Sequence, residues 1–303
     1  MRSLKNRFVL VFISLCFSSL LIAQDDILKN ENTKEENTKD LDSSHISLSL
    51  NYISDAVYMG RKDSISAPYL YPALTYHHKS GFYANGSLSY LVKSKEGRVD
   101  LFLLTAGFDF AIKKIEGDIS FTKYFFNEDS YNVISEVETD LSALMRYDFN
   151  IINVSMAANT YFNSDRSSDF FLSLEINRDI ITKNKKFQFS PTVGVNFGSQ
   201  NFYEQYYINN RFGNGRGQSS GQGQGNSSTS QSTSVDLRES KKFNLMAIEF
   251  SLPIWYVHKS FNVVIMPTYV IPQNEGILSV DDVLVEENLD NTFYFITGIT
   301  YSF

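Results

Sequence analysis

The residues with the clearest chemical potential are three acidic side chains that alternate along one predicted strand. Glu136, Glu138 and Asp140 are spaced two residues apart, so in an extended chain they project from the same face. Ser142 and Arg146 lie an even number of residues further along the strand, so they share this face. A wall of carboxylates attracts cations and disfavours anions. Alternatively, Arg146 and nearby tyrosine hydroxyls satisfy these carboxylates inside a filled interior, and the sequence leaves both interpretations open.

Other acidic residues occupy positions in the alternating pattern that would place them on the same inner face. Asp109, Glu175 and Glu249 alternate with apolar neighbours, and placing any of them against lipid would be costly. We therefore expect a net acidic inner surface. Its predicted lining residues are Asp109, Glu136, Glu138, Asp140, Arg146, Glu175 and Glu249.

Histidine is the usual general base in hydrolytic sites, and its positions here argue against catalysis. His45, His77, His78 and His258 all fall at the predicted periplasmic end, away from an external rim where a barrel enzyme would need its base. His77 and His78 are adjacent, so in a strand they point to opposite faces and cannot chelate one metal. No phosphate loop, zinc spacing or nucleophile elbow appears. We predict no enzyme activity, no metal and no cofactor.

Two loops contain further candidate features. Gly60 to Ser64, with the sequence GRKDS, offers charges that could clamp an anion, although lone loop charges are usually solvated. Gly213 to Ser234 is rich in Gly, Ser and Gln and forms either a constriction or a solvated external loop. The aromatic stretch just before it, from Asn201 to Phe212, is expected to mark the membrane rim or to extend a strand.

The elements that must position these residues are strands. From His45 onward, segments of about 9 to 14 residues alternate apolar and polar side chains, the length that a tilted strand needs to cross a bilayer. About twelve are present, which predicts an all-β, transmembrane, antiparallel up-and-down β-barrel. Their centres lie near Leu50, Ala73, Ser87, Ala106, Phe121, Leu141, Met156, Leu174, Val193, Phe250, Ile265 and Ile296.

The predicted connections alternate in length, as short periplasmic turns and longer external loops do in such barrels. The short turns are His78 to Gly81, Lys113 to Gly117, Asp148 to Asn150, Thr182 to Lys185 and Val257 to Ser260. The longer loops are Ser54 to Ser66, Lys93 to Arg98, Asn127 to Val133, Asn163 to Ser168, Ser199 to Ser240 and Pro272 to Asp290.

A soluble barrel would show the same alternation with its faces exchanged. Soluble surfaces are rich in Lys and Glu, whereas the polar faces here are mostly Ser, Thr, Asn, Gly and Tyr, which favours the membrane barrel. Lys123 is an exception, because it shares the parity of apolar Phe121 and Phe125. Pro191 and Pro253 are expected to weaken a central ladder and to mark bulges, since proline lacks the N–H that a ladder requires.

The first 23 residues have basic side chains followed by an apolar run that ends at Ala23, the pattern of a secretory signal peptide. Its removal would take the only cysteine with it and change the formal net charge from -7 to -10, because Arg2, Lys5 and Arg7 are lost. An acidic mature chain argues against nucleic acid as a partner. Residues 24–44 are predicted to be a disordered periplasmic spacer, and residues 45–303 the barrel.

The C-terminal run ITGITYSF, with Tyr301 and Phe303, resembles the terminal strand by which the insertion machinery recognises bacterial outer-membrane proteins. The stretch from Ser54 to Leu91 is similar to uncharacterised Bacteroidota-type outer-membrane β-barrel proteins. This resemblance implies an outer-membrane location, with the lipid bilayer and the insertion machinery as partners. It implies no substrate and no catalytic residues.

We therefore expect an outer-membrane pore for small polar solutes, with an acidic lumen that favours cations. The alternative is a structural or surface-interaction barrel with a blocked lumen and partner-binding external loops.

Overall fold

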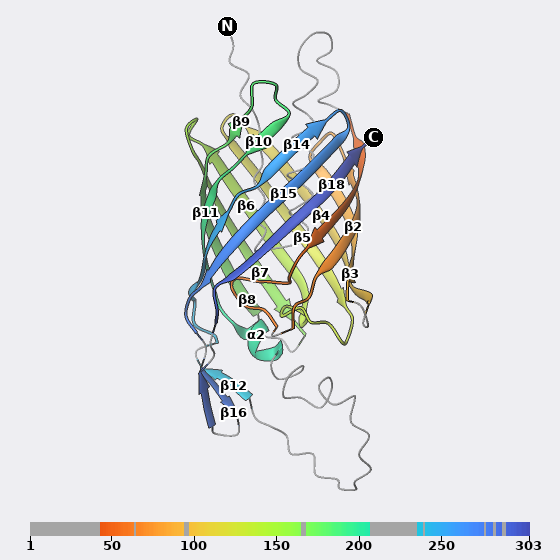
Figure 1. The fold of residues 1–303 in the computed structure, drawn as a ribbon. Helices are drawn as coiled ribbons and strands as arrows, with labels where there is room; N and C mark the ends of the chain where they lie inside the picture. The colour runs from red at the N-terminus through yellow and green to blue at the C-terminus, as the bar shows by residue number, and fades with distance from the viewer. Residues whose placement is uncertain are drawn as a thin grey trace.

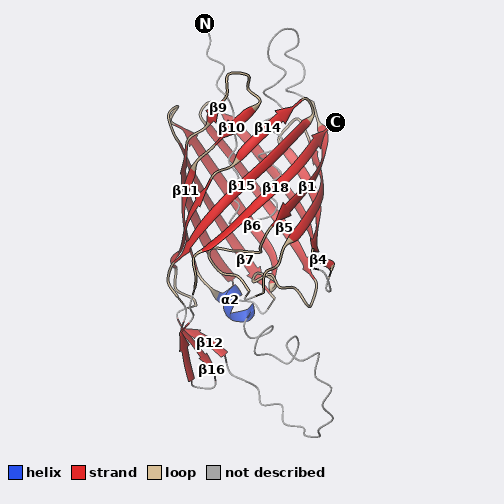
Figure 2. Cartoon of the chain, in the orientation of Figure 1, coloured by secondary structure: helices blue, strands red, loops and turns tan. Residues whose placement is uncertain are grey.

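The structure is a computed structural model that describes residues 43–63, 65–93, 97–164, 168–206, 235–238, 240–275, 277–280, 283–286 and 289–303. The described part is almost entirely β-strand, with one short helix (Figure 2). The predicted signal peptide, nearly all of the predicted spacer and the segment 213–234 lie outside the described residues.

The large sheet contains fifteen segments. Eight come from the first half of the barrel: β1 (His45–Ile53), β2 (Tyr69–His77), β3 (Phe82–Leu91), β4 (Arg98–Ile112), β5 (Ile115–Phe126), β6 (Val137–Asp148), β7 (Asn153–Asn163) and β8 (Ser168–Asn177). The others are β9 (Ile180–Ile181), β10 (Phe187–Phe189), β11 (Thr192–Gly198), β13 (Asn244–Ser251), β14 (Ile254–His258), β15 (Phe261–Pro272) and β18 (Thr292–Ser302).

These segments form a closed twelve-stranded antiparallel barrel (Figure 1), because β8 with β9, β10 with β11, and β13 with β14 are three interrupted strands. The barrel closes where β1 pairs with β18, with Leu50 opposite Ile299. The amide of Phe303 extends this seam by donating to the carbonyl of Ile46 at 3.0 Å. The predicted fold is confirmed, and the last strand closes the barrel against the strand centred near Leu50.

Proline explains the interrupted strands. Pro191 separates β10 from β11, and Pro253 separates β13 from β14 on the adjacent strand. Proline has no N–H to donate to the ladder. The two breaks face each other, and the Ser190 amide still donates to the Pro253 carbonyl at 3.0 Å. The strands therefore continue across the breaks in direction, with a locally altered ladder.

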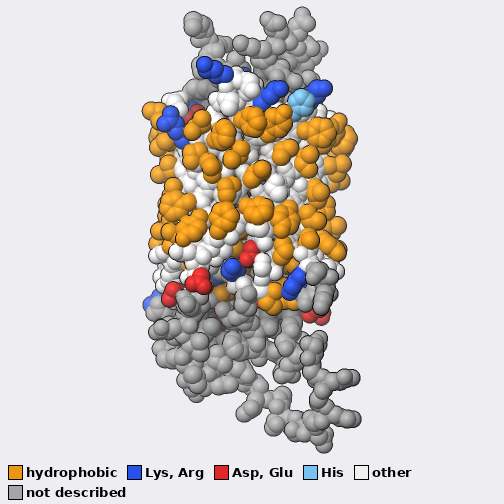
Figure 3. Space-filling model, in the orientation of Figure 1, with side chains coloured by type: hydrophobic (Ala, Val, Ile, Leu, Met, Phe, Trp, Pro, Cys, Tyr) orange, Lys and Arg blue, Asp and Glu red, His pale blue; other side chains and the backbone are white. Residues whose placement is uncertain are grey.

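The outer surface carries a broad apolar band (Figure 3). In β18, Phe293 and Ile299 are exposed while Tyr294 and Ile296 are buried, so the last strand has a lipid face and an inner face. The same alternation holds in β1 and β2. A water-exposed face of this composition would be unfavourable, whereas the hydrocarbon region of a bilayer accommodates it.

The connections alternate in length as predicted. Short turns occupy residues 78–81, 113–114, 149–152, 182–186 and 259–260, and longer connections lie at the opposite end. By the rule for bacterial barrels, the short-turn end is periplasmic. The connection between β11 and β13 contains α2 (Asn201–Tyr206) and β12 (Val235–Arg238), and the connection between β15 and β18 contains β16 (Ile277–Val280) and β17 (Val283–Glu286). Strands β12, β16 and β17 form a small separate sheet. No helix of the described residues is long and apolar enough to cross a membrane.

The turn at Gly81 provides a test of the short-turn geometry. Gly81 has a φ of +97°, and a Cβ added there would lie 2.2 Å from the Asp109 carbonyl oxygen. We predict that G81A lowers the free energy of unfolding by about 1–3 kcal/mol, because backbone strain and a backbone clash combine. Urea unfolding in lipid vesicles, followed by circular dichroism, measures this. G86A is the control, since its Cβ would lie 3.7 Å from Leu104 Cδ2; equal loss in both variants would contradict the prediction.

Candidate functional site

The inner wall of the barrel is lined mainly by small polar side chains. These residues are buried and alternate with exposed apolar residues along each strand. They include Ser47, Ser49, Asn51, Thr75, Asn85, Ser87, Thr105, Ser120, Thr122, Ser155, Asn159, Ser173, Asn196 and Thr300. This wall offers hydrogen-bond donors and acceptors along much of the barrel, between buried aromatic and aliphatic side chains such as Tyr71, Trp255 and Ile296.

Glu175 and Glu249 are the acidic residues whose predicted inner position has the clearest functional meaning. Both are in register with Gly194, which lies on the strand between them, so no side chain separates the two positions. Among the described residues, no Lys, Arg or His forms an ion pair with either carboxylate. Glu175 Oε2 is buried without a hydrogen-bond partner. This carboxylate pair therefore has no ion-pair partner among the described residues, although Arg146 interacts electrostatically with Glu175 from the same cross-strand row.

Asp109 also lies on the inner face, at the short-turn end. Its Oδ1 is 3.0 Å from His77 Nε2, and the His77 ring stacks on His45 with 5.2 Å between ring centroids. His78 lies in the following turn and His258 is the last residue of β14. All four histidines are thus at the short-turn end, as the sequence predicts.

Asp140 occupies the predicted inner position but is not free. It is fully buried, accepts a hydrogen bond from Tyr124 Oη at 3.2 Å and accepts a second from Ser142 Oγ. The tyrosine and serine hydroxyls therefore satisfy this carboxylate, which is the structural alternative that the sequence leaves open. Asp140 contributes to packing of the wall.

The prediction that Glu136 and Glu138 line the lumen beside Asp140 is wrong. Glu136 lies in the turn before β6, where it accepts a hydrogen bond from Ser164 Oγ at 3.3 Å. Glu138 is 55% exposed in its side chain and pairs with Lys123 at 3.1 Å. The cause is a register shift between Val137 and Thr139 against β7, because one extra residue in a strand reverses the faces that precede it.

The same bulge accounts for Lys123, whose parity with apolar residues is anomalous in the sequence. Lys123 keeps its outward position, where its Nζ lies 5.9 Å from the centre of the Phe125 ring, and Glu138 turns out to meet it. The two charges form an exposed pair on the outer surface. The irregularity lies in β6 rather than in the strand of Lys123.

Arg146 is buried on the inner face, but it pairs with partners other than those first considered. Its Nη2 donates to Asp179 Oδ2 at 2.7 Å, and its Nη1 lies 3.6 Å from Glu116 Oε2. Asp179 also accepts hydrogen bonds from Asn153, Asn177 and Ser190. This network neutralises Arg146 at the short-turn end of the lumen.

Three functional carboxylates were missed in the sequence. Asp118 accepts a hydrogen bond from Tyr83 Oη at 2.9 Å, and its shared parity with Ser120 and Thr122 could have identified it. Asp179 lies in the break between β8 and β9, where apolar and polar residues do not alternate and so do not indicate a face. Asp169 binds the amides of Asn201 and Phe202 at 2.8 and 2.7 Å, and this long-range contact has no sequence signal.

At the long-loop end, the connection of residues 54–68 folds inward as a tight hairpin. Tyr58 and Arg61 exchange backbone hydrogen bonds of 2.8 Å around Met59 and Gly60, whose φ values of 45° and 80° match a type I′ turn. A Cβ on Gly60 would lie 2.9 Å from Pro272 Cβ. The hairpin tip is therefore packed closely against Pro272 at the end of β15.

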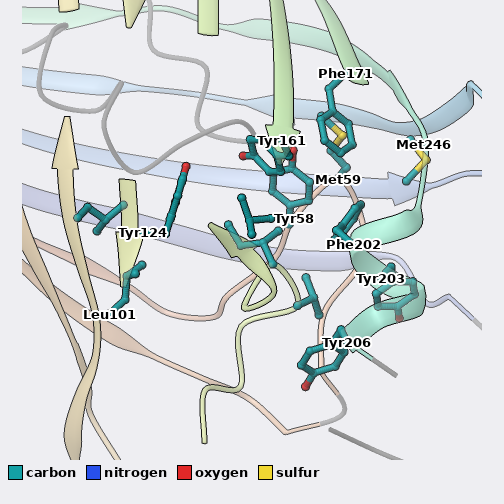
Figure 4. Packing of buried hydrophobic residues seen from close by; sticks show 14 of the residues in the cluster. Tyr58, Met59, Leu101, Tyr124, Tyr161, Phe171, Phe202, Tyr203, Tyr206 and Met246 are labelled. Carbon is teal, nitrogen blue, oxygen red and sulfur yellow. The ribbon is translucent and has the colours of Figure 1, made fainter. Parts of the chain in front are cut away.

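The tip packs into an aromatic cluster (Figure 4). The Tyr58 ring lies 5.7, 5.5 and 5.2 Å from the rings of Tyr161, Phe171 and Phe202. Tyr161 is on β7 and Phe171 on β8, which face β1 and β2 across a twelve-stranded barrel. The hairpin therefore spans the mouth, and we refer to residues 54–68 as the plug.

Arg61 anchors the plug. It is fully buried, and its guanidinium donates to the carbonyl oxygens of Met59, Met246, Gln273 and Asn274 and to Gln200 Oε1, at 2.6 to 3.1 Å. The possibility that GRKDS clamps an anion is therefore not supported at Arg61. Lys62 instead pairs with Asp55 at 3.3 Å.

Helix α2 covers the plug from the external side (Figure 1). Phe202, Tyr203 and Tyr206 are buried against it, and Tyr206 donates a hydrogen bond to Asp63. The described part of the aromatic stretch from Asn201 thus forms a helix at the mouth rather than an extension of the preceding strand. Among the described residues, no group of three potential metal ligands occurs.

No family model and no curated relative matches the chain. Solved structures resemble it in fold. The KdgM porin has a TM-score of 0.45 at 10% identity, covering 85% of this chain and 99% of that one; the NanC porin has 0.44 at 10%, covering 84% and 98%. The translocator domain of the autotransporter NalP from Neisseria meningitidis has 0.44 at 8%, covering 94% and 95%. At these identities the likeness concerns the fold alone.

The anchoring role of Arg61 generates a prediction. R61Q removes most of the donors that hold the plug, and buried carbonyls lose charge-assisted hydrogen bonds. We expect the free energy of local opening to fall by about 2–4 kcal/mol. Hydrogen exchange at the Tyr58 and Arg61 amides measures it. The adjacent K62Q is the control, with an expected change within about 0.5 kcal/mol; equal protection in R61Q and the parent chain would refute the anchor.

Proposed function

We propose that the protein is an outer-membrane channel for small polar solutes, neutral or cationic, whose external mouth is closed by the plug in the described conformation. The observation that carries the proposal is the polar inner wall with the adjacent carboxyls of Glu175 and Glu249, which have no ion-pair partner among the described residues. The likeness to porins agrees with a channel-type barrel and adds nothing on the solute.

The composition of the wall supports the solute class. Serine, threonine and asparagine side chains exchange hydrogen bonds with water and with polar solutes, and so they replace part of a solute's hydration. Arg146 forms ion pairs with Asp179 and Glu116 and also interacts with Glu175, so it offsets part of the acidic charge. Negative charge on Glu175 or Glu249 faces the lumen, where it favours cations over anions.

The plug supports a closed resting state. Burial of Tyr58 and Met59 stabilises it by about 1.5–3 kcal/mol for each side chain, and the bonds of Arg61 add to this. Nothing covalent holds the hairpin in place, and its ends are two paired strands. Opening then requires a change of a few kcal/mol, which corresponds to a small open population.

A second function is favoured by the density of the aromatic cluster. If the plug never leaves the mouth, the barrel is a structural or surface-interaction protein, and its external loops bind a partner. The same hairpin that closes a gated channel would then serve as a permanent lid. Conductance separates the two functions.

The register at the end of β1 supplies the test variant. Ile53 pairs with Tyr69, so residues 54–68 can be replaced by Asn-Gly, the preferred two-residue hairpin turn. We predict that the full chain conducts rarely in planar bilayers and that this variant conducts at least about tenfold more often, because a barrier of more than about 1.4 kcal/mol is removed.

If neither protein conducts while both keep the circular dichroism of a folded barrel, the channel function fails. The blocked-lumen function then stands. If the full chain conducts as frequently as the variant, the channel function stands, but the plug does not control conduction.

The carboxylate pair is tested in the plug-replaced protein. We predict that E175Q/E249Q lowers the permeability ratio of K⁺ to Cl⁻ by about twofold or more, because the amides remove two negative charges from the path. The reversal potential in a salt gradient measures the ratio. E138Q is the matched control, since Glu138 is on the outer surface. An unchanged ratio in E175Q/E249Q would exclude the pair from the path.

A further inference from the structure

A ring of basic side chains surrounds the short-turn end of the barrel. Most of them are exposed, and all lie in or directly beside a short turn except Arg178, which lies in the break between β8 and β9. We call this set the basic ring. Its members are Lys79, Lys113, Lys114, Arg178, Lys183, Lys185, Lys186 and Lys259.

The described residues do not neutralise the basic ring. In the described turns, Asp148 is the acidic side chain outside the lumen, while Asp179 and Glu116 face inward and are bound to Arg146. No member of the ring forms a salt bridge with a described residue. The described short-turn end thus carries eight cations and one anion outside the lumen, whereas the whole chain has a formal net charge of -7.

The charges at the other end of the barrel are arranged differently. There, Lys62 pairs with Asp55, Arg98 with Asp100 and Lys123 with Glu138. The described cations of that end are thus largely compensated within the chain, whereas those of the basic ring are left for an external anion.

The position of the basic ring at the edge of the lipid-facing band indicates which anion it binds. Exposed apolar side chains stand next to it at the edge of the lipid-facing band, including Phe82, Ile112, Phe149, Phe187 and Phe261. In Figure 3, basic side chains lie at the upper margin of the apolar band, the end where Figure 1 marks the C-terminus. Lysine stems can lie along such an edge while their ammonium groups reach the level of lipid phosphates.

We propose that the basic ring binds anionic phospholipid headgroups in the leaflet at the short-turn end. The phosphodiester of a lipid such as phosphatidylglycerol supplies the missing negative charge at the height where the ammonium groups lie. Because cations surround the barrel, the ring recruits an annulus of these lipids rather than one molecule. This interaction is independent of whether the lumen conducts.

The test uses the full chain reconstituted in phosphatidylcholine vesicles that contain trace spin-labelled phosphatidylglycerol or spin-labelled phosphatidylcholine. Electron paramagnetic resonance measures the fraction of each lipid that is immobilised by the protein, whatever its orientation. We expect phosphatidylglycerol to be preferred by about threefold at low salt. The preference should fall towards one in 1 M NaCl, where screening acts over about 3 Å.

The variant K79Q/K114Q/K183Q/K186Q should lose most of the preference. It leaves Lys113, Lys185 and Lys259 in place, because they have positive φ and hold the turns. K183Q/K186Q, confined to one turn, should lose a smaller part, and it serves if the fourfold variant does not fold. K241Q/K242Q is the matched control, since this exposed lysine pair lies at the opposite end.

Absence of a preference in the parent chain, or an unchanged preference in both ring variants, would overturn the proposal. Loss of the preference in K241Q/K242Q would assign the lipid contact to the long-loop end instead. A preference that appears only when lipopolysaccharide is added to the vesicles would also contradict it, because the anion would then come from the other leaflet.

Discussion

The constraint on which this structure depends is the satisfaction of backbone hydrogen bonds in a medium without water. Each unpaired N–H or C=O in a bilayer core costs several kcal/mol, so a sheet can cross it only if the first strand meets the last. The pairing of β1 with β18, from Ser47 opposite Ser302 to Ile53 opposite Ile296, fulfils this condition. Once the barrel is closed, alternation of side chains fixes an inner and an outer face for every strand.

This alternation is also what makes the fold readable from the sequence. Strand positions, turn parity and the lipid face of the last strand all depend on a period of two and on connection length, which are local properties. The prediction fails where the period is broken. Glu138 was assigned to the lumen by counting residues, and one bulge at Val137 to Thr139 moved it to the outer surface. The position of Lys123 on an otherwise apolar face indicates an irregularity nearby, but it does not show which strand contains the bulge.

The plug could not be predicted for a different reason. Tyr58 meets Tyr161 and Phe171, more than a hundred positions away in the sequence, and the contact exists because β1 and β7 lie on opposite walls of a closed barrel. Most hydrogen bonds of Arg61 are equally non-local, since four of its five acceptors come from Gln200 just before α2, from β13 and from the connection after β15. Loop composition alone made GRKDS resemble a solvated charge cluster, whereas its tip is a buried anchor.

The charges of the described chain fall into three zones, and distance keeps them separate. The acidic pair lies in the wall, the compensated ion pairs lie at the long-loop end, and the basic ring lies at the short-turn end. An apolar band of about 25 Å separates the two rims, while the screening length at physiological salt is about 8 Å. The basic ring therefore cannot neutralise the charges of the long-loop end through solution. A change at the short-turn rim should leave the ion pairs at the long-loop rim unaltered, so lipid recruitment and closure of the mouth by the plug can be examined as separate properties of one barrel.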